Sequence, residues 1–149
     1  MLLSPGTKLD PYEILATVGA GGMGAVSKAR DTRLDRIVAI KTSQTEFSER
    51  FEREARAVAT LNHPNICQLY DLGTMPDGGG YLVMEYIDGS PIAPVDSPRK
   101  LLDLAVQFAD GMAAAHGGPR GCRRLIRHRP PPVAHARAAV MDWFDAGRI

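Results

Sequence analysis

The stretch that decides the fold is a glycine-rich segment followed by a short β-branched run. Residues 19–26 are Gly-Ala-Gly-Gly-Met-Gly-Ala-Val, a G-x-G-x-x-G-x-V pattern, and residues 38–41 are Val-Ala-Ile-Lys. Glycines let the backbone approach a chain of phosphates without a side-chain clash, and backbone N–H groups can then face the anion. In a dinucleotide site the same glycines open a helix. Here the residues after Gly24 alternate between apolar and polar, which predicts a loop between two strands.

Each of these two patterns has a simpler explanation when it stands alone. A glycine-rich hairpin that binds nothing has the same sequence as one that covers phosphates. Lys41, seventeen residues after Gly24, could likewise be a surface lysine at the end of a strand. After a glycine-rich hairpin, however, Lys41 is a candidate to hold phosphate oxygens as a positive point charge.

Residue periodicity predicts an α+β domain. Alternating or β-branched runs predict strands at residues 12–18, 25–30, 36–41, 66–72 and 81–87, with a hairpin-type loop at 77–80. Apolar residues at intervals of three or four predict helices at residues 46–61 and 101–116. Within residues 12–42, three short strands joined by tight turns indicate an antiparallel meander, not parallel βαβ units.

The first predicted helix carries one glutamate on its apolar side. At about 100° per residue, Glu54 falls inside the apolar arc, while the other three glutamates of the helix do not. That arc consists of Phe47, Phe51, Ala55, Val58 and Leu61. A carboxylate on a buried face needs a partner, because removing an unpaired charge from water costs several kcal/mol. Lys41 is the most economical partner, and the alternative is a Glu54 that reaches solvent at the rim of the face.

The composition excludes several other classes of protein. Hydrophobic residues make up 44% and charged residues 23% of the 149 residues, so the chain is neither collagen-like nor wholly disordered. No apolar run approaches the roughly 18 residues of a membrane span, and residues 1–6 lack the features of a signal peptide. The two cysteines, Cys67 and Cys122, are too few for a disulfide framework or a four-cysteine zinc site. We therefore expect a cytoplasmic location.

Taken together, these segments resemble the N-terminal lobe of bacterial serine/threonine protein kinases. Further shared segments are Pro5-Gly6-Thr7, Tyr12-Glu13-Ile14, Arg53-Glu54-Ala55, Leu61 to Ile66 and Val83-Met84-Glu85-Tyr86. The resemblance covers about residues 5–116. It implies a protein-kinase-like N-lobe over residues 12–88, made of a five-stranded antiparallel sheet plus helix αC. Residues 1–11 would be an N-terminal extension, and residues 89–116 the hinge connector and helix αE of an incomplete C-lobe.

The resemblance also implies an ATP site and a role for each of its residues. Lys41 would contact the α- and β-phosphates and form an ion pair with Glu54, and Met84 would be the gatekeeper. Val26 and Ala39 would form the roof over adenine, and backbone groups of Glu85 and Ile87 would bond the adenine edge. The nucleotide-binding residues implied are Val18, Gly19, Ala20, Gly21, Gly22, Met23, Gly24, Val26, Ala39, Lys41, Met84, Glu85 and Ile87.

Two motifs of the kinase family are missing from the sequence. The catalytic loop H-R-D-L-x-x-x-N, whose Asp positions the attacking hydroxyl, does not follow His116, and Asp-Phe-Gly does not occur. We interpret Asp142, which is followed by Trp143, as a coincidental Asp. No catalytic residue and no metal ligand is identified, so the Mg²⁺ that the family uses would lack its protein ligands.

Two functions therefore fit the sequence. The first is an ATP-binding fragment of a serine/threonine kinase, a transferase, that is inactive by itself and whose partners are ATP and a protein substrate. The alternative is a non-catalytic kinase-like module that docks another kinase.

Residues 117–149 have a composition unlike the rest of the chain. Residues 1–116 contain 11 Lys and Arg and 15 Asp and Glu, so this part is acidic. Residues 117–149 contain seven Arg and two Asp, so this part is basic, and the two parts sum to the net charge of +1 of the whole chain. This basic, Arg/Pro-rich tail includes Pro130-Pro131-Pro132, and only residues 134–144 could form a short helix. Our hypothesis is that the tail is read out of frame, and the rival is a truncation that regulates a full-length kinase. We expect no nucleic-acid partner, because the tail lacks spaced aromatic residues.

Overall fold

The chain folds as two compact units. The computed structural model describes residues 3–21, 24–43, 46–89 and 97–117. One unit spans residues 1–52 and 69–87, and the other spans residues 53–68 and 88–149. The predicted tail from residue 118 onward, with its short helix, lies outside the described residues.

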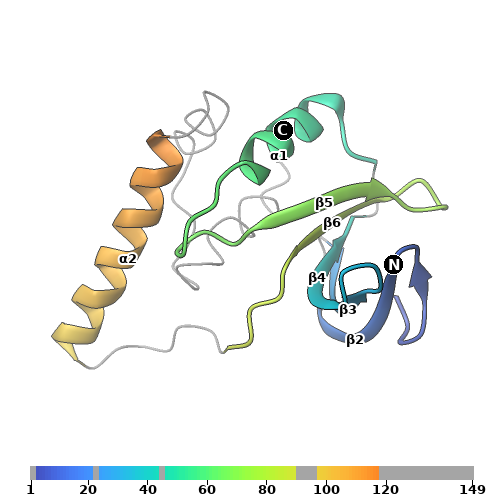
Figure 1. Ribbon diagram of the computed structural model, residues 1–149, viewed down its shortest axis with the longest axis horizontal. Helices are drawn as coiled ribbons and strands as arrows, with labels where there is room; N and C mark the ends of the chain where they lie inside the picture. Colours follow the sequence, from blue (N-terminus) through green and yellow to red (C-terminus); the bar gives the residue numbers. More distant parts are fainter. Residues whose placement is uncertain (1–2, 22–23, 44–45, 90–96, 118–149) are drawn as a thin grey trace. The chain divides into compact units, whose positions relative to one another are not determined.

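The first unit is built on an antiparallel sheet of six strands in the order β1-β2-β3-β4-β6-β5 (Figure 1). The strands are β1 Lys8–Leu9, β2 Tyr12–Gly21, β3 Gly24–Asp31, β4 Arg36–Thr42, β5 Leu69–Thr74 and β6 Gly80–Glu85. The α+β class is confirmed, and so is the antiparallel meander predicted for residues 12–42, which is formed by β2, β3 and β4. The sheet has one strand more than expected, because Lys8 and Leu9 pair with Glu13 and Tyr12.

Strand period explains where the core of the sheet lies. Along β3, Ala25, Ser27 and Ala29 are buried, and the residues between them are half-buried, as the pleat requires. The core cluster on that face consists of Leu3, Tyr12, Ile14, Ala29, Val38, Ile40 and Val83. The opposite face of the sheet is therefore left for other contacts.

The segment before β2 is part of this unit. Leu3 is only 6% exposed and lies in the core cluster. The Gly6 N–H donates to the Ile14 carbonyl at 2.8 Å, and the Ile14 N–H donates to the Thr7 carbonyl at 2.9 Å. These backbone bonds hold the N-terminal segment along β2 and produce the additional strand.

Helix α1, Glu49–Ala59, is shorter than the predicted helix over residues 46–61. Ser48 caps its start, because its Oγ accepts from the Phe51 N–H at 3.2 Å. Phe47 therefore precedes the helix. The Phe47 ring stacks on the Phe51 ring, with 4.3 Å between their centroids. It also lies close to Gly80, where an added Cβ would be 2.6 Å from the Phe47 ring.

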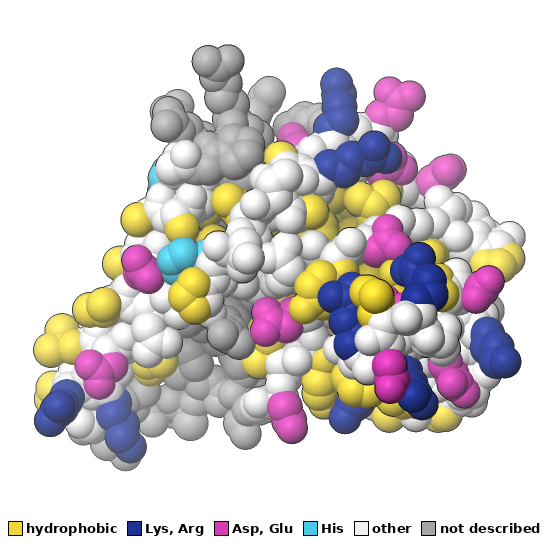
Figure 2. All heavy atoms as spheres, in the orientation of Figure 1, with side chains coloured by type: hydrophobic (Ala, Val, Ile, Leu, Met, Phe, Trp, Pro, Cys, Tyr) yellow, Lys and Arg dark blue, Asp and Glu magenta, His cyan; other side chains and the backbone are white. Residues whose placement is uncertain are grey.

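Helix α2, Pro98–Gly117, begins three residues before the predicted start. Ser97 and Pro98 explain the difference, because serine is favoured at the N-cap and proline at the first helical position. Three large apolar side chains of the helix are mostly exposed: Leu101 at 58%, Leu102 at 65% and Val106 at 66%. Apolar atoms are accordingly visible on the surface over α2 (Figure 2).

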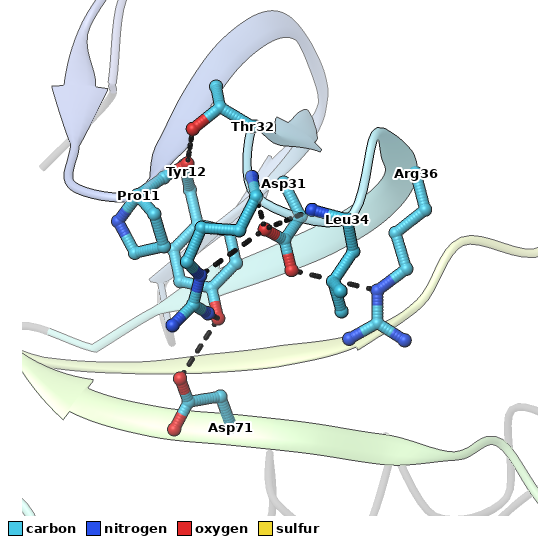
Figure 3. Close-up of polar contacts among 8 residues, drawn as sticks. Pro11, Tyr12, Asp31, Thr32, Leu34, Arg36 and Asp71 are labelled. Atoms are coloured by element: carbon cyan, nitrogen blue, oxygen red, sulfur yellow. Dashed lines mark hydrogen bonds and ion pairs between the residues drawn. The ribbon is translucent and has the colours of Figure 1, made fainter.

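A buried carboxylate organises the turn between β3 and β4 (Figure 3). Asp31 is fully buried, and its Oδ1 accepts from the N–H groups of Arg33 at 3.1 Å and Leu34 at 3.4 Å. Its two carboxylate oxygens form ion pairs with Arg33 and Arg36, each at 3.6 Å. Burial alone would raise the pKa of Asp31, but these N–H groups and guanidinium groups outweigh it and lower the pKa.

The same turn is tied to β5 through Tyr12, because Arg33 Nη2 donates to the Tyr12 hydroxyl at 3.4 Å. The hydroxyl of the buried Tyr12 donates to Asp71 Oδ2 at 2.9 Å. Burial and the Asp71 carboxylate raise the pKa of Tyr12, which keeps the hydroxyl protonated as a donor. The Arg36 guanidinium lies over the Tyr70 ring at 3.8 Å from its centroid. The turn, β2 and β5 are thus held together by polar contacts around one edge of the core.

Replacing Asp31 by Asn should lower the free energy of unfolding at pH 7 by about 1–2 kcal/mol. Because the pKa of Asp31 is lowered by folding, the ionised group stabilises the fold above its ordinary pKa of about 3.9 and loses this effect as the pH falls through the folded-state value. The difference between wild type and variant should therefore shrink towards pH 3. Urea unfolding at both pH values measures it.

The matched control for this change is Asp35→Asn in the same turn. Asp35 is 74% exposed and has a positive φ of 49°, which asparagine also adopts readily. Its replacement should change the free energy of unfolding by less than about 0.5 kcal/mol. Equal losses for the two variants, or a pH-independent loss for Asp31→Asn, would contradict the role given to the buried carboxylate.

Candidate functional site

The strand register brings four predicted site residues to one face of the sheet. Val26 lies opposite Lys41, and Ala39 lies opposite Met84. Directly opposed residues of an antiparallel pair share a face, as do residues two apart on one strand. By the same register Lys28, opposite Ala39, and Leu82, opposite Lys41, join this face. We call it the lysine face, and it is the side of the sheet turned away from the core cluster.

The glycine-rich segment is a hairpin between β2 and β3. Gly19 pairs with Val26, Ala20 with Ala25, and Gly21 with Gly24. The predicted loop between strands is confirmed, and residues 22 and 23 at its tip lie outside the described residues. Val18 is 59% exposed, and Gly19 and Ala20 are also exposed. The backbone at this end of β2 is thus accessible to a ligand.

Gly24 is the one described glycine of this hairpin whose backbone requires glycine. Its φ is +123°, and a Cβ at this position would overlap the carbonyl oxygen of Thr42 on β4. At Gly19, by contrast, an added Cβ would have nothing within 4 Å. Gly24 therefore allows β3 to leave the hairpin in close contact with the strand that carries Lys41.

Replacing Gly24 by Ala should lower the free energy of unfolding by about 1–3 kcal/mol, because alanine is strained at this φ and clashes with backbone. Gly19→Ala, in the same hairpin, should leave stability within about 0.5 kcal/mol of wild type. The midpoints of urea unfolding for the two variants measure the contrast. If both variants unfold at the wild-type midpoint, the conformation described for Gly24 is wrong.

Lys41 lies in the middle of the lysine face and is only 8% exposed. Lysine is rarely enclosed to this extent unless its charge has a partner. Glu54, the partner expected from the sequence, is half-buried on α1 and belongs to the second unit. The Lys41–Glu54 ion pair remains a prediction.

The far end of the lysine face is formed where β6 ends. Met84 is 2% exposed, and β6 finishes at Glu85, so the chain leaves the sheet through the half-buried residues Glu85 to Ile87. Sequence patterns did not single out Lys28, whose Nζ lies 4.6 Å from the centroid of the Tyr86 ring. Lys28 could have been found from the sequence, because it lies two residues after Val26 on a predicted strand and therefore shares a face with it. Lys28 and Tyr86 thus flank this end of the site.

Comparison with known proteins decides the family. The sequence model of the protein kinase domain matches residues 12–116, more than half of the chain. The chain belongs to the protein kinase family. The hairpin and Val38-Ala39-Ile40-Lys41 match the G-x-G-x-x-G-x-V and V-A-I-K sequence patterns of this family. The resemblance expected from the sequence is confirmed.

The relatives narrow the family to bacterial serine/threonine kinases. The serine/threonine-protein kinase PrkC of Bacillus subtilis is 39% identical over 117 residues, which cover 70% of this chain and 18% of PrkC. A probable serine/threonine-protein kinase of Clostridium perfringens is 38% identical over 145 residues, which cover 91% of this chain and 21% of that protein. The chain therefore spans about a fifth of the length of these curated relatives.

A solved structure shows the same kinase fold. A double mutant of the Mycobacterium tuberculosis PknI kinase domain superimposes with a TM-score of 0.64 at 28% identity. The match covers 78% of this chain and 53% of that domain.

Two kinds of feature are absent from the described residues of the kinase chain. In residues 3–21, 24–43, 46–89 and 97–117, no group of three or more His, Cys, Asp or Glu side chains is arranged to hold a metal ion. Within the same ranges, no helix is long and apolar enough to cross a membrane.

Proposed function

We propose that this chain is the ATP-binding lobe of a serine/threonine protein kinase, formed by residues 12–88 and continued by a connector and helix over residues 89–116. The observation that carries the proposal is the register of β3, β4 and β6. It lines up Val26, Ala39, Lys41 and Met84 on one face beside the glycine-rich hairpin. The two simpler explanations, a glycine-rich hairpin that binds nothing and a lysine on the surface, do not require these four residues to share a face.

The hairpin end of the lysine face fits a chain of phosphates. Gly24 has a conformation that only glycine adopts without strain, and the hairpin backbone at Gly19 and Ala20 is exposed. Backbone N–H groups in such a loop are suited to bind phosphate oxygens. Lys41 supplies a buried positive charge on the same face and would hold the α- and β-phosphates, with Glu54 as its ion-pair partner.

The other end of the face fits an aromatic base. Val26 and Ala39 provide the apolar roof, and Met84 closes the back of the site. The backbone of Glu85 and Ile87 leaves the sheet here, so that its N–H and C=O groups can bond the edge of adenine. The complete set proposed to contact ATP is Val18, Gly19, Ala20, Gly21, Gly22, Met23, Gly24, Val26, Ala39, Lys41, Met84, Glu85 and Ile87.

The residues present do not fit a resident Mg²⁺. The described residues contain no cluster of potential metal ligands, and the sequence lacks both Asp-Phe-Gly and the catalytic loop with its Asn. Phosphoryl transfer depends on positioning and on charge stabilisation by these groups. We therefore propose that the chain binds ATP without transferring its phosphate to a protein substrate.

We propose that the tail, residues 117–149, is not part of the kinase domain. The family match stops at residue 116, although an alignment that covers 91% of this chain must also include part of residues 117–149. We propose that the tail is translated out of frame. The alternative is that the chain is a truncated form that regulates a full-length kinase. Translation of the DNA downstream of His116 in the other two frames tests it. Absence of both His-Arg-Asp-Leu-Lys-Pro and Asp-Phe-Gly from those frames would refute the frameshift.

The exposed apolar residues of α2 favour a second candidate function. Leu101, Leu102 and Val106 give the helix an apolar surface in addition to its half-buried side, and such surfaces commonly bind other proteins. A kinase-like module that docks another kinase would use this kind of surface.

The proposed cellular setting is the cytoplasm. ATP is the proposed ligand, and the two cysteines of the sequence are too few for a disulfide framework, as is usual for proteins of reducing compartments. The proposed partners are ATP and, by family membership, a protein substrate or a partner kinase.

Thermal unfolding of the whole chain with and without ATP tests the proposed function. At an ATP concentration ten times the dissociation constant, binding to the folded chain should add about 1.4 kcal/mol to stability and raise the Tm by several degrees. A docking module instead predicts no effect of ATP and an affinity for a full-length kinase that survives Lys41→Ala. Unchanged Tm at millimolar ATP would argue against the nucleotide site.

A further inference from the structure

A second lysine of the lysine face contacts an aromatic ring beyond the end of β6. Lys28 belongs to β3, and its Nζ lies 4.6 Å from the centroid of the Tyr86 ring. Tyr86 directly follows Glu85, the last residue of β6. In the sheet, β4 lies between β3 and β6. The contact therefore joins two segments that are not neighbours in the sheet.

The residue between these two segments is small. Lys28 lies directly opposite Ala39 on β4, and Ala39 lies opposite Met84 on β6, so the three residues form one row across the lysine face. Neighbouring strands lie about 4.8 Å apart, which separates β3 from β6 by about 10 Å. The long side chains of Lys28 and Tyr86 together span this distance. Between them β4 contributes only the methyl group of Ala39, which does not obstruct the contact.

The contact is an attraction between a cation and an aromatic ring. An ammonium group within about 6 Å of a ring centroid is attracted by the negative face of the ring, and this attraction changes an equilibrium about two- to fivefold even at exposed sites. Lys28 and Tyr86 are both half-buried. A lysine can also lay its methylene stem along an apolar surface while its charge stays at the tip. The charge of Lys28 thus holds the Tyr86 ring close to the sheet.

The ring that Lys28 holds belongs to the segment proposed to bond adenine. We call residues 85–87 the exit segment, because the chain leaves the sheet there. Val38 and Glu85 are the last pair of the ladder between β4 and β6, so Tyr86 and Ile87 lie beyond it. The backbone groups assigned to the adenine edge belong to Glu85 and Ile87, on either side of Tyr86. Fixing the Tyr86 ring therefore restricts both of these neighbours.

We propose that Lys28 is a positioning residue that holds the exit segment through the Tyr86 ring and thereby sets the affinity of the site for an aromatic base. The effect on the base rests on the proposed function, whereas the attachment of the exit segment does not. The two lysines of the lysine face then have separate roles. Lys41 would act on the phosphates by direct contact, and Lys28 acts on the base through Tyr86 without touching the nucleotide.

Hydrogen–deuterium exchange of the whole chain without nucleotide tests the attachment. Lys28→Met keeps an unbranched stem but removes the charge, so the amides of residues 85–87 should exchange about two- to fivefold faster. Lys28→Arg keeps a cation and should restore exchange to near the wild-type rate. The matched control is Lys8→Met on β1, which removes an exposed lysine of the same unit. Unchanged exchange in Lys28→Met, or the same increase in Lys8→Met, would overturn the attachment.

Variants of Tyr86 show whether Lys28 acts through the ring. Tyr86→Phe keeps an aromatic face and should leave exchange of the exit segment near the wild-type rate, whereas Tyr86→Leu should speed it about as much as Lys28→Met does. In a Tyr86→Leu background, Lys28→Met should cause no further increase, since both changes remove the same contact. If Lys28→Met speeds exchange equally in both backgrounds, Lys28 does not act through Tyr86 and the proposal is wrong.

Titration calorimetry with adenosine and with inorganic tripolyphosphate tests the role at the base. Lys28→Met should weaken adenosine binding about two- to fivefold, because the competent arrangement of the exit segment is populated less, and should leave tripolyphosphate binding unchanged. Lys28→Arg should restore the affinity for adenosine. Unchanged adenosine affinity in Lys28→Met, or a loss for tripolyphosphate alone, would overturn the role at the base. If the wild-type chain binds neither adenosine nor ATP, the proposed function fails, and the exchange experiment still decides whether Lys28 holds the exit segment.

Discussion

Phosphoryl transfer to serine or threonine should rise at least about 100-fold over that of the chain itself when residues 1–116 are joined to the C-terminal part of a kinase domain. The added segment would come from a serine/threonine kinase of the same family and carry the catalytic loop and Asp-Phe-Gly. Removing a single preorganised group that stabilises the transition state typically costs a factor of 10²–10³. The chain lacks several such groups at once.

The chimera has an internal control in Lys41. Transfer of radiolabelled phosphate to a Ser/Thr protein substrate measures the rate for the chimera, for its Lys41→Met variant and for residues 1–149. The first should be active and the other two should stay at background. If residues 1–149 transferred phosphate as fast as the chimera, the proposal that this chain lacks catalytic groups would be wrong.

Replacing Lys41 by Met should weaken ATP binding by roughly 30- to 150-fold, which corresponds to about 2–3 kcal/mol. Methionine fills a similar volume, so the sheet should remain folded while the positive charge on the lysine face is lost. The loss should be confined to nucleotides, because adenosine offers no phosphate for the charge to hold. Titration calorimetry with ATP and with adenosine measures both effects.

The matched control for Lys41→Met is Lys8→Met on β1. Lys8 is an exposed lysine in the same unit, and it does not lie on β3, β4 or β6, whose register forms the lysine face. Its replacement should leave ATP affinity within about twofold of wild type. A similar loss in the two variants would indicate a nonspecific effect of charge and not a phosphate site.

Patterns of residues predicted β2 to β6, five of the six strands of the sheet. The glycine spacing predicted a hairpin between strands, and the structure pairs Gly19 with Val26 and Gly21 with Gly24. The β-branched run predicted a strand at residues 36–41, which is the largely buried β4, Arg36–Thr42. These predictions succeed because hairpin register and strand period depend on nearby residues.

The features that the sequence did not predict depend on contacts between distant residues or on local caps. Strand β1 forms because backbone groups of the N-terminal segment bond to β2. Residues 1–11 show no alternation of apolar and polar residues that would predict this strand. Helix α1 begins after Ser48, although Phe47 continues its apolar spacing, because the serine caps the helix. The attachment of Asp110 to His63 joins residues 47 positions apart, a contact without a signal in one sequence.

Methyl NMR spectra of the chain titrated with ATP decide whether nucleotide binds on the lysine face. The methyl signals of Val26 and Ala39, on that face, should shift progressively with ATP concentration. Those of Val38 and Ile40, on the core face of the same sheet, should shift much less. Equal shifts on both faces, or no shift at Val26 and Ala39 at saturating ATP, would contradict a nucleotide site on the lysine face.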